Sequence, residues 1–281
     1  MITAFLDLYA SIFGRPWLAK FNKALVLAGL RGLGILNYRN FEISGEKGFA
    51  QSVLNTYKRR RLAGLSTADA VVFDIGANIG NWALMVESLK SKVAYRLFAF
   101  EPSPETFTTL AARVQEIPAI RPFNIGLSSR RGTARLHDYA ESAHGSTHAS
   151  LEDGVITEVH RQEERTFDVK VTTGDEFCRE QRVTFIDLLK VDVEGHELKV
   201  LQGFQAMIAS GRIGAIQFEF NETMIPSRTF LNDFSSILNN YNLFRILPKG
   251  GLLAIRDDEL PIFRYQNIAA ILKSDESHSK V

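Results

Sequence analysis

Acidic residues follow short apolar runs in this chain, at the positions where buried strands would end. Asp74 ends the run AVVF, and Glu101 ends the run LFAF. Gly76 and Gly80 come directly after Asp74, where glycines permit positive φ angles and close approach of a ligand to the backbone. Because ligands of open α/β sheets bind beyond the carboxyl ends of the strands, we expect these four residues to border one binding pocket.

The charge and spacing of this loop favour a cationic ligand over a dinucleotide. Dinucleotide-binding folds use G-x-G-x-x-G with a pyrophosphate at the helix N-terminus, whereas this loop reads G-x-x-x-G and Asp74 would repel a pyrophosphate. S-Adenosylmethionine carries a sulfonium and an ammonium group but no phosphate. Glu101 is placed to accept hydrogen bonds from ribose hydroxyls. A nicotinamide-dependent oxidoreductase and a non-catalytic binding module are the alternatives.

A second group of charges lies at the end of a later apolar run. Strand alternation places Lys190, Asp192 and Glu194 on one side. Charges on a buried strand are costly unless they pair or bind a ligand, so we take these three as catalytic candidates. The alternative is a structural Lys190–Asp192 pair with Glu194 capping the next helix. His196 stands at a helix start, where the helix dipole would keep it neutral as a base; an exposed first-turn residue is the alternative.

Four of the six histidines fall within an irregular segment of the chain. His137, His144, His148 and His160 have spacings that match no standard zinc signature. We therefore expect a solvated loop here, with His144 and His148 as secondary candidates for contact with a substrate.

The chain resembles the FkbM-type S-adenosylmethionine-dependent methyltransferases, a branch of the class I methyltransferases. The matching stretches are FDIGANIG, FEPSP, NIGLS and IDLLKVDVEGHE, and the resemblance covers about residues 70 to 255. It implies O-methylation of a small molecule or glycan, with S-adenosylmethionine as cofactor. The implied cofactor residues are Asp74, Gly76 and Asn78 around the methionine part, Gly80 closing the loop, Glu101 on the ribose, Pro102 and Ser103 flanking the adenine, and Asn124 and Ile125 at its edge.

Methyl transfer to a hydroxyl requires in-line geometry and a group that removes the hydroxyl proton, either a base or a metal. Glu219 and Asn221 end another strand-like run, and with Asp192 they offer oxygen ligands for a divalent cation. Catechol-type O-methyltransferases use a similar arrangement, but with adjacent Asp-Asn in place of Glu-x-Asn, which argues against the metal. We expect the acceptor to be a hydroxyl of a sugar, a glycan or a secondary metabolite.

The elements that position these residues alternate between strands and helices. Such alternation predicts an α/β, doubly wound, mainly parallel sheet; with the resemblance we expect seven strands and a Rossmann-like class I methyltransferase fold. Residues 243–247 and 252–255, separated by PKGG, predict a closing hairpin at one edge. The insert 127–172 breaks the alternation, and we expect two extra strands there, at 132–139 and 167–171, flanking a long loop.

Composition narrows the class of protein. The 281 residues include 33 Lys and Arg against 32 Asp and Glu, and this formal charge of +1 disfavours a dedicated nucleic-acid-binding protein. The single Cys178 excludes an internal disulfide and is compatible with the cytoplasm, where we expect the protein. No stretch reaches the roughly 18 apolar residues of a membrane span.

The motif map divides the chain into three parts. We expect an N-terminal helical extension over 1–65, the S-adenosylmethionine-binding domain over 66–260, and a C-terminal tail over 261–281. The apolar N-terminal helices are interpreted as capping the main domain, in preference to lying on a membrane or partner surface.

Overall fold

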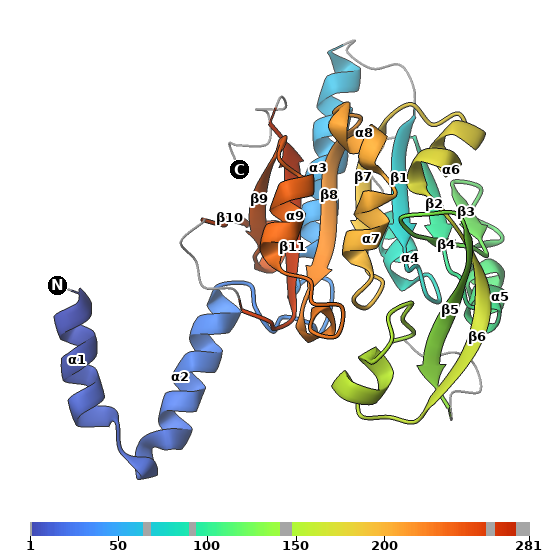
Figure 1. Ribbon diagram of the computed structural model, residues 1–281. Helices are drawn as coiled ribbons and strands as arrows, with labels where there is room; N and C mark the ends of the chain where they lie inside the picture. The colour runs from blue at the N-terminus through green and yellow to red at the C-terminus, as the bar shows by residue number, and fades with distance from the viewer. Residues whose placement is uncertain (1, 64–68, 90–93, 141–147, 257–261, 274–281) are drawn as a thin grey trace.

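The fold is built on one large sheet with helices on both faces (Figure 1). The computed structural model describes residues 2–63, 69–89, 94–140, 148–256 and 262–273. The strand order is β10-β9-β11-β8-β7-β1-β2-β3. These strands are β1 (Ala70–Ile75), β2 (Tyr95–Phe100), β3 (Ile120–Phe123), β7 (Ile186–Val191), β8 (Ile213–Phe220), β9 (Tyr241–Ile246), β10 (Leu252–Ala254) and β11 (Gln266–Leu272).

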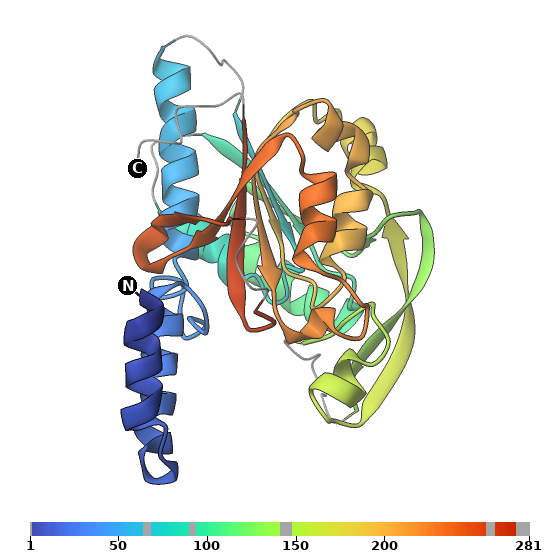
Figure 2. The same ribbon diagram turned by 60° about the vertical axis from the view of Figure 1, so that its left-hand side comes forward.

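The central strands are apolar because helices bury both of their faces. Every residue of β1 and of β8 is buried, as expected for strands covered on two sides. Figure 2 shows helices on the two sides of the sheet. One face carries α3 (Glu46–Leu62), α4 (Asn81–Ser88) and α5 (Pro104–Val114). The other carries α6 (Gly174–Glu180), α7 (Glu197–Gln202), α8 (Gln205–Ala209) and α9 (Leu231–Ile237).

Strand pairing confirms the predicted doubly wound, mainly parallel sheet, but the described residues form a sheet of eight strands in place of the expected seven, and the C-terminal strands are arranged differently. β1 pairs in parallel with β2 and β7, and β7 pairs in parallel with β8. The predicted hairpin forms between β9 and β10. The strand beside β8, however, is β11, which runs antiparallel to both β8 and β9. The expected tail over 261–281 is therefore wrong for residues 266–272, because two neighbouring strands bury this short apolar run inside the sheet.

The N-terminal boundary expected at residue 65 also does not match the packing. Phe49, Val53 and Leu54 of α3 are buried in the core that covers β1. Ile35 pairs with Gln266 at the start of β11. The catalytic fold thus takes in residues from about 35 onward.

The first two helices do not cap the main domain, so that expectation is wrong. α1 (Ile2–Phe13) and α2 (Ala19–Gly32), joined by the short helix η1 (Pro16–Leu18), form a hairpin that projects from the body of the molecule (Figures 1 and 2). None of the residues of α2 is buried, so its apolar side chains make no core with the sheet.

The insert contains the two predicted strands, which together with a third short strand form a second, smaller sheet that the sequence did not predict. It contains β4 (Gly126–Leu127), β5 (Gly132–Tyr139) and β6 (Glu164–Thr172), in the order β4-β6-β5. β5 pairs antiparallel with β6 along its whole length. The chain between them contains the helical turn η2 (Val155–Val159), and further short helices η3 (Glu222–Met224) and η4 (Pro248–Gly250) follow β8 and β9.

Candidate functional site

A cavity of about 640 Å³ opens at the carboxyl ends of β1, β2 and β7. Residues 75–78 and 100–102 form one part of its wall, and 190 and 192–194 form another. The second sheet contributes apolar side chains, among them Leu127 and Leu136. The structure therefore brings the glycine loop, the second strand end and the fourth strand end together, as the sequence predicted.

The glycine loop packs so tightly that a side chain at its first glycine has no room. Gly76 has φ 77°, and a Cβ atom there would lie 1.8 Å from the backbone oxygen of Asp192. Asn78 also has a positive φ, 48°, and its N–H donates to Glu101 Oε2 at 3.0 Å. The loop is thus fixed against both neighbouring strand ends.

Glu101 presents a buried carboxylate to the cavity. Its Oε1 accepts the Ser103 N–H at 2.8 Å, and its Oε2 accepts the Asn78 N–H. Burial raises the pKa of Glu101 to about 7, although both backbone donors oppose this shift. Each carboxylate oxygen keeps a free lone pair, which suits a bidentate contact with two ribose hydroxyls. The cavity and this carboxylate fit S-adenosylmethionine.

Four other predicted cofactor residues, Gly80, Ser103, Asn124 and Ile125, do not line the cavity. Pro102 lines it directly. Ser103 is the N-cap of α5, and the Asn124 amide donates to the backbone oxygens of Glu101 and Pro102. Ile125 packs against the core, and Gly80, with φ 84°, is the N-cap of α4.

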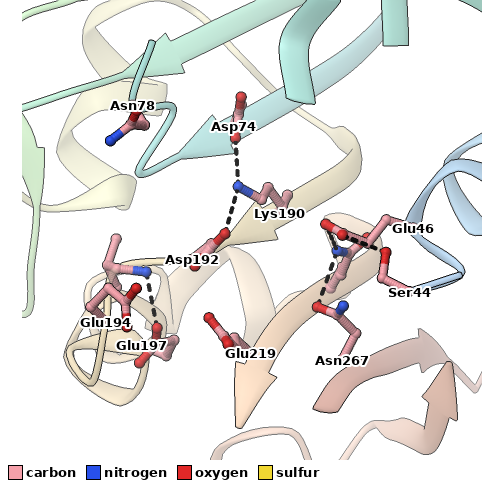
Figure 3. A network of polar contacts seen from close by, with 12 residues as sticks. Ser44, Glu46, Asp74, Asn78, Lys190, Asp192, Glu194, Glu197, Glu219 and Asn267 are labelled. Carbon is pink, nitrogen blue, oxygen red and sulfur yellow. Dashed lines mark hydrogen bonds and ion pairs between the residues drawn. The ribbon is translucent and has the colours of Figure 1, made fainter. Parts of the chain in front are cut away.

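Lys190 forms a buried ion-pair centre between two strand ends (Figure 3). Its Nζ lies 3.2 Å from Asp74 Oδ1 and 3.2 Å from Asp192 Oδ2. Burial opposes its charge, but Asp192 and Asp74 raise the pKa of Lys190, so it stays protonated. Asp74 is 0% exposed and therefore does not face the cavity. The sequence-based expectation that its carboxylate contacts a cationic ligand is wrong. Lys190 is a fixed positive charge and cannot act as a base.

The predicted cation ligands Asp192, Glu219 and Asn221 lie together, and part of this set is already bound by Lys190 and Thr223. Burial and the neighbouring Asp192 raise the pKa of Glu219 well above its usual range. Asn221 Oδ1 accepts the N–H of Thr223 at 2.7 Å and the hydroxyl of Thr223 at 2.6 Å. The amide of Asn221 therefore turns its nitrogen toward Glu219, at 2.9 Å, and its oxygen is already occupied.

Glu194 lines the cavity and pairs with a histidine of the insert. His148 Nδ1 lies 2.7 Å from Glu194 Oε1. A tight turn positions this carboxylate, with φ 52° at Glu194 and 98° at Gly195. Glu197 holds the turn, because its carboxyl accepts the N–H groups of Val193 and Gly195, both at 2.9 Å. Sequence reasoning missed Glu197, although an acid two residues after a turn glycine is a detectable signal.

His196, predicted as a base, is a structural residue. It is buried, with Nδ1 2.6 Å from Glu152 Oε1 and Nε2 2.9 Å from Ser128 Oγ. Both ring nitrogens are thus occupied, and the side chain joins α7 to the insert. The expectation fails because the insert covers this helix start.

The remaining histidines separate into two environments. The ring centroids of His160 and His148 lie 4.8 Å apart, and a nitrogen of each ring lies within 4.8 Å of the other and of a Glu194 oxygen. His137 pairs instead with Glu164, at 3.0 Å, on the second sheet. His144 lies outside the described residues. The expectation of a solvated loop is therefore wrong for His137, which is buried on β5, whereas the side chain of His148 is 43% exposed.

Comparison with known proteins decides the family. A family model described as the methyltransferase FkbM domain matches residues 74–243, more than half of the chain. The chain belongs to the FkbM methyltransferase family. Hexuronic acid methyltransferase AglP of Haloferax volcanii is 32% identical over 200 residues, which cover 71% of this chain and 72% of AglP. 2-O-methyltransferase NoeI of Sinorhizobium fredii is 27% identical over 209 residues, covering 70% and 83%.

A solved structure is also similar to this FkbM methyltransferase. An FkbM methyltransferase from Methylobacillus flagellatus aligns with a TM-score of 0.44 and 15% identity, over 82% of this chain and 52% of that chain. Membership of the family establishes an S-adenosylmethionine-dependent methyltransferase and thereby confirms the cofactor expected from the sequence. The nicotinamide-dependent alternative is excluded.

The N-terminal segment of this methyltransferase supplies a wall of the cavity that the sequence did not predict. Tyr38, Arg39 and Glu46 line it, together with Tyr265 from the approach to β11. The rings of Tyr38 and Tyr265 meet edge to face at 5.8 Å. Glu46 is held by Ser44 Oγ at 2.7 Å and by Gln217 Nε2 at 3.0 Å. Glu46 interacts electrostatically with Lys190 and Asp192, which border the same cavity (Figure 3).

Replacing Glu101 by glutamine should weaken S-adenosylmethionine binding about 10- to 100-fold, because an amide keeps only one of the two acceptor oxygens for the ribose. Isothermal titration with S-adenosylmethionine measures the dissociation constant. The matched control is Glu116→Gln, which removes an exposed acid two residues beyond the end of α5 and should leave the constant unchanged. Equal affinity of wild type and Glu101→Gln would refute the ribose contact.

Proposed function

We propose that this FkbM methyltransferase transfers the methyl group of S-adenosylmethionine to a hydroxyl of a sugar. The observation that carries the proposal is the composition of the cavity wall beyond the glycine loop and Glu101. There Tyr38 and Tyr265 offer aromatic surfaces, and Asp192 and Glu194 offer carboxylates. Aromatic surfaces suit the apolar faces of sugar rings, while carboxylates accept their hydroxyl hydrogens.

The names of two relatives support a sugar acceptor. AglP is described as a hexuronic acid methyltransferase, and NoeI as a 2-O-methyltransferase. A uronic acid would bring a carboxylate to the cavity, and Arg39 is a cation on the wall at which it could bind. We therefore place sugars with an acidic group first among the acceptors to be tested.

The residues of this chain have distinct roles in the proposed reaction. When bound, S-adenosylmethionine supplies an electrophilic methyl group on a sulfonium. Glu101 and the Gly76 loop hold the cofactor, and Asp192, fixed by Lys190, accepts a hydrogen bond from the sugar. The Glu194–His148 pair takes up the proton of the reacting hydroxyl as the new O–CH₃ bond forms and the S–CH₃ bond breaks.

The pair is favoured as the base because the other catalytic candidates predicted from the sequence are charged, fully hydrogen-bonded or weakly basic. Lys190 stays charged, and His196 is occupied at both ring nitrogens. Although burial opposes it, Lys190 lowers the pKa of Asp192, which makes Asp192 a weak base. Glu194, by contrast, lines the cavity and has a second titratable group directly hydrogen-bonded to it.

Assay with a panel of acceptors tests the proposed function. The purified protein is incubated with S-adenosylmethionine and a uronic acid glycoside, the matching neutral hexoside or a catechol, and products are identified by mass spectrometry. We expect methylation of sugar, with S-adenosylhomocysteine formed in equal amount. Turnover of the catechol with none of the sugars would overturn the sugar assignment.

Chelator treatment should leave the activity unchanged, because the proposed base is an imidazole–carboxylate pair. The measurement is the rate of methyl transfer after dialysis against EDTA, compared with dialysis against buffer. A loss of activity that Zn²⁺ restores would instead identify His148, His160 and Glu194 as metal ligands and overturn the base assignment. A loss of activity that Mg²⁺ restores would support a divalent cation site at Asp192 and Glu219.

A further inference from the structure

The helical hairpin formed by α1 and α2 exposes an unusual amount of apolar surface. Large apolar side chains on both helices and on their connection face solvent, among them Phe5, Leu8, Ile12, Trp17, Phe21 and Leu25. Contiguous apolar surface of this kind on a globular protein marks a site of interaction. The function proposed above uses no residue of this hairpin.

Contacts between the two helices fix the hairpin without covering that surface. Tyr9 OH donates to Asn22 Oδ1, and the Asn22 amide donates to the backbone oxygen of Phe13 at 2.9 Å. The rings of Tyr9 and Phe13 stack at 4.7 Å, and Phe21 lies 6.1 Å from Phe13. These contacts lie close to the turn, and the helices diverge beyond it (Figure 1).

The charges of the hairpin are mainly basic. Lys20, Lys23 and Arg31 occur at spacings of three and eight residues, which place them along one side of α2. Arg15 lies at the turn, and Asp7 is the one acidic residue between positions 2 and 33. Trp17, 78% exposed, stands at the tip, where a tryptophan is typical of a membrane–water interface.

We propose that this hairpin binds the surface of an anionic lipid bilayer, lying in the interface without crossing it. Exposed leucine, phenylalanine and tryptophan beside a basic stripe is the composition of interfacial helices. No helix in the described part of the chain is long and apolar enough to span a membrane. A second copy of the chain is a poorer occupant, because it would bring two basic stripes together.

The position of the hairpin relates lipid binding to the cavity. The cavity wall begins at Tyr38, six residues after α2 ends at Gly32. A bound hairpin therefore holds the cavity close to the lipid surface. Lipid binding by the hairpin is independent of the acceptor that the cavity takes.

Vesicle flotation with the full chain tests this proposal. We expect binding to vesicles of phosphatidylcholine mixed with phosphatidylglycerol, much weaker binding to phosphatidylcholine alone, and partial release by salt. Combining Leu8→Asp with Leu25→Asp should reduce binding to anionic vesicles more than tenfold, and Lys20→Glu with Lys23→Glu should do the same. The matched control is Leu62→Asp, because Leu62 is 79% exposed on α3, outside the hairpin, and its change should leave binding intact.

The contrary results are equally definite. Equal binding by the wild type and the Leu8→Asp, Leu25→Asp variant, or no binding to anionic vesicles, would overturn the proposal. A dimer in analytical ultracentrifugation that this variant dissociates, with no vesicle binding, would identify a second copy as the occupant. The rate of methyl transfer to a soluble sugar distinguishes failure of this proposal from failure of the proposed function. The hairpin variants should leave that rate unchanged.

Discussion

Replacing Lys190 by methionine is expected to lower the free energy of unfolding by about 3–5 kcal/mol, because it leaves the carboxylate of Asp74 buried without its cation. Methionine keeps most of the volume of the side chain, so a packing defect contributes little. The Asp192 carboxylate also loses its partner, but its side chain is 39% exposed and water can solvate it. Urea unfolding followed by circular dichroism measures the change.

A double-mutant cycle distinguishes loss of the ion pair from general damage. Asp74→Asn removes the buried charge, so Lys190→Met should be much less destabilising in that background than in the wild type. The matched control is Lys199→Met, which removes a half-exposed lysine that pairs with Glu152 at 2.8 Å and should be worth about 1 kcal/mol or less. Equal destabilisation by Lys190→Met in both backgrounds would show that Asp74 and Lys190 are not coupled.

This ion pair illustrates what the sequence reveals and what it does not. Alternation along the strand put Lys190 and Asp192 on one side, and the structural Lys190–Asp192 pair was an open alternative. The role of Asp74 was not accessible, because the parallel pairing of β1 with β7 places residue 74 opposite residue 190 across more than one hundred residues of chain. Sequence spacing carries no information on such a pairing.

The same distinction holds for the fold. Continuous apolar runs such as AVVF and LFAF predicted buried parallel strands, because a strand that helices cover on both faces is apolar along its whole length. β11 was missed because its short apolar run lies close to the end of the chain and is not followed by a helix that would indicate a crossover unit. It belongs to the sheet because it pairs with β8 on one side and β9 on the other. The predicted domain boundaries at 65 and 260 failed for the same reason, since tertiary contacts define them.

The candidate site also contains some residues that local sequence motifs reveal and others that only the fold brings together. Local motifs identified Gly76 and Glu101, whose partners lie on the adjoining strand end. The Glu194–His148 contact joins residues 46 positions apart, and only the insert's own fold brings them together. The wall that includes Tyr38 comes from a segment outside the recognisable motifs.

Changing Glu194 to glutamine is expected to lower kcat/KM for methyl transfer about 10²- to 10⁴-fold, the range typical of a lost general base. The pH dependence should change as well. The hydrogen bond to Glu194 raises the pKa of His148 above its usual value, although burial opposes the shift. The pair accepts a proton only while His148 is neutral, so wild-type activity should be full at higher pH and fall as the pH drops through this raised pKa. Without the carboxylate, the remaining activity should persist to lower pH.

Rates measured across the pH range for three variants test this assignment. His148→Gln should lose activity like Glu194→Gln and should also lose the acidic limb of the profile, because the titrating group is gone. The matched control is His137→Gln, which breaks a similar histidine–glutamate contact with Glu164 on the second sheet and should keep both rate and profile. A general effect on the insert would impair His137→Gln as much as His148→Gln, whereas a proton-accepting pair predicts that only the contact at the cavity matters. An unchanged acidic limb in His148→Gln would assign the titration to another group and remove His148 from the reaction.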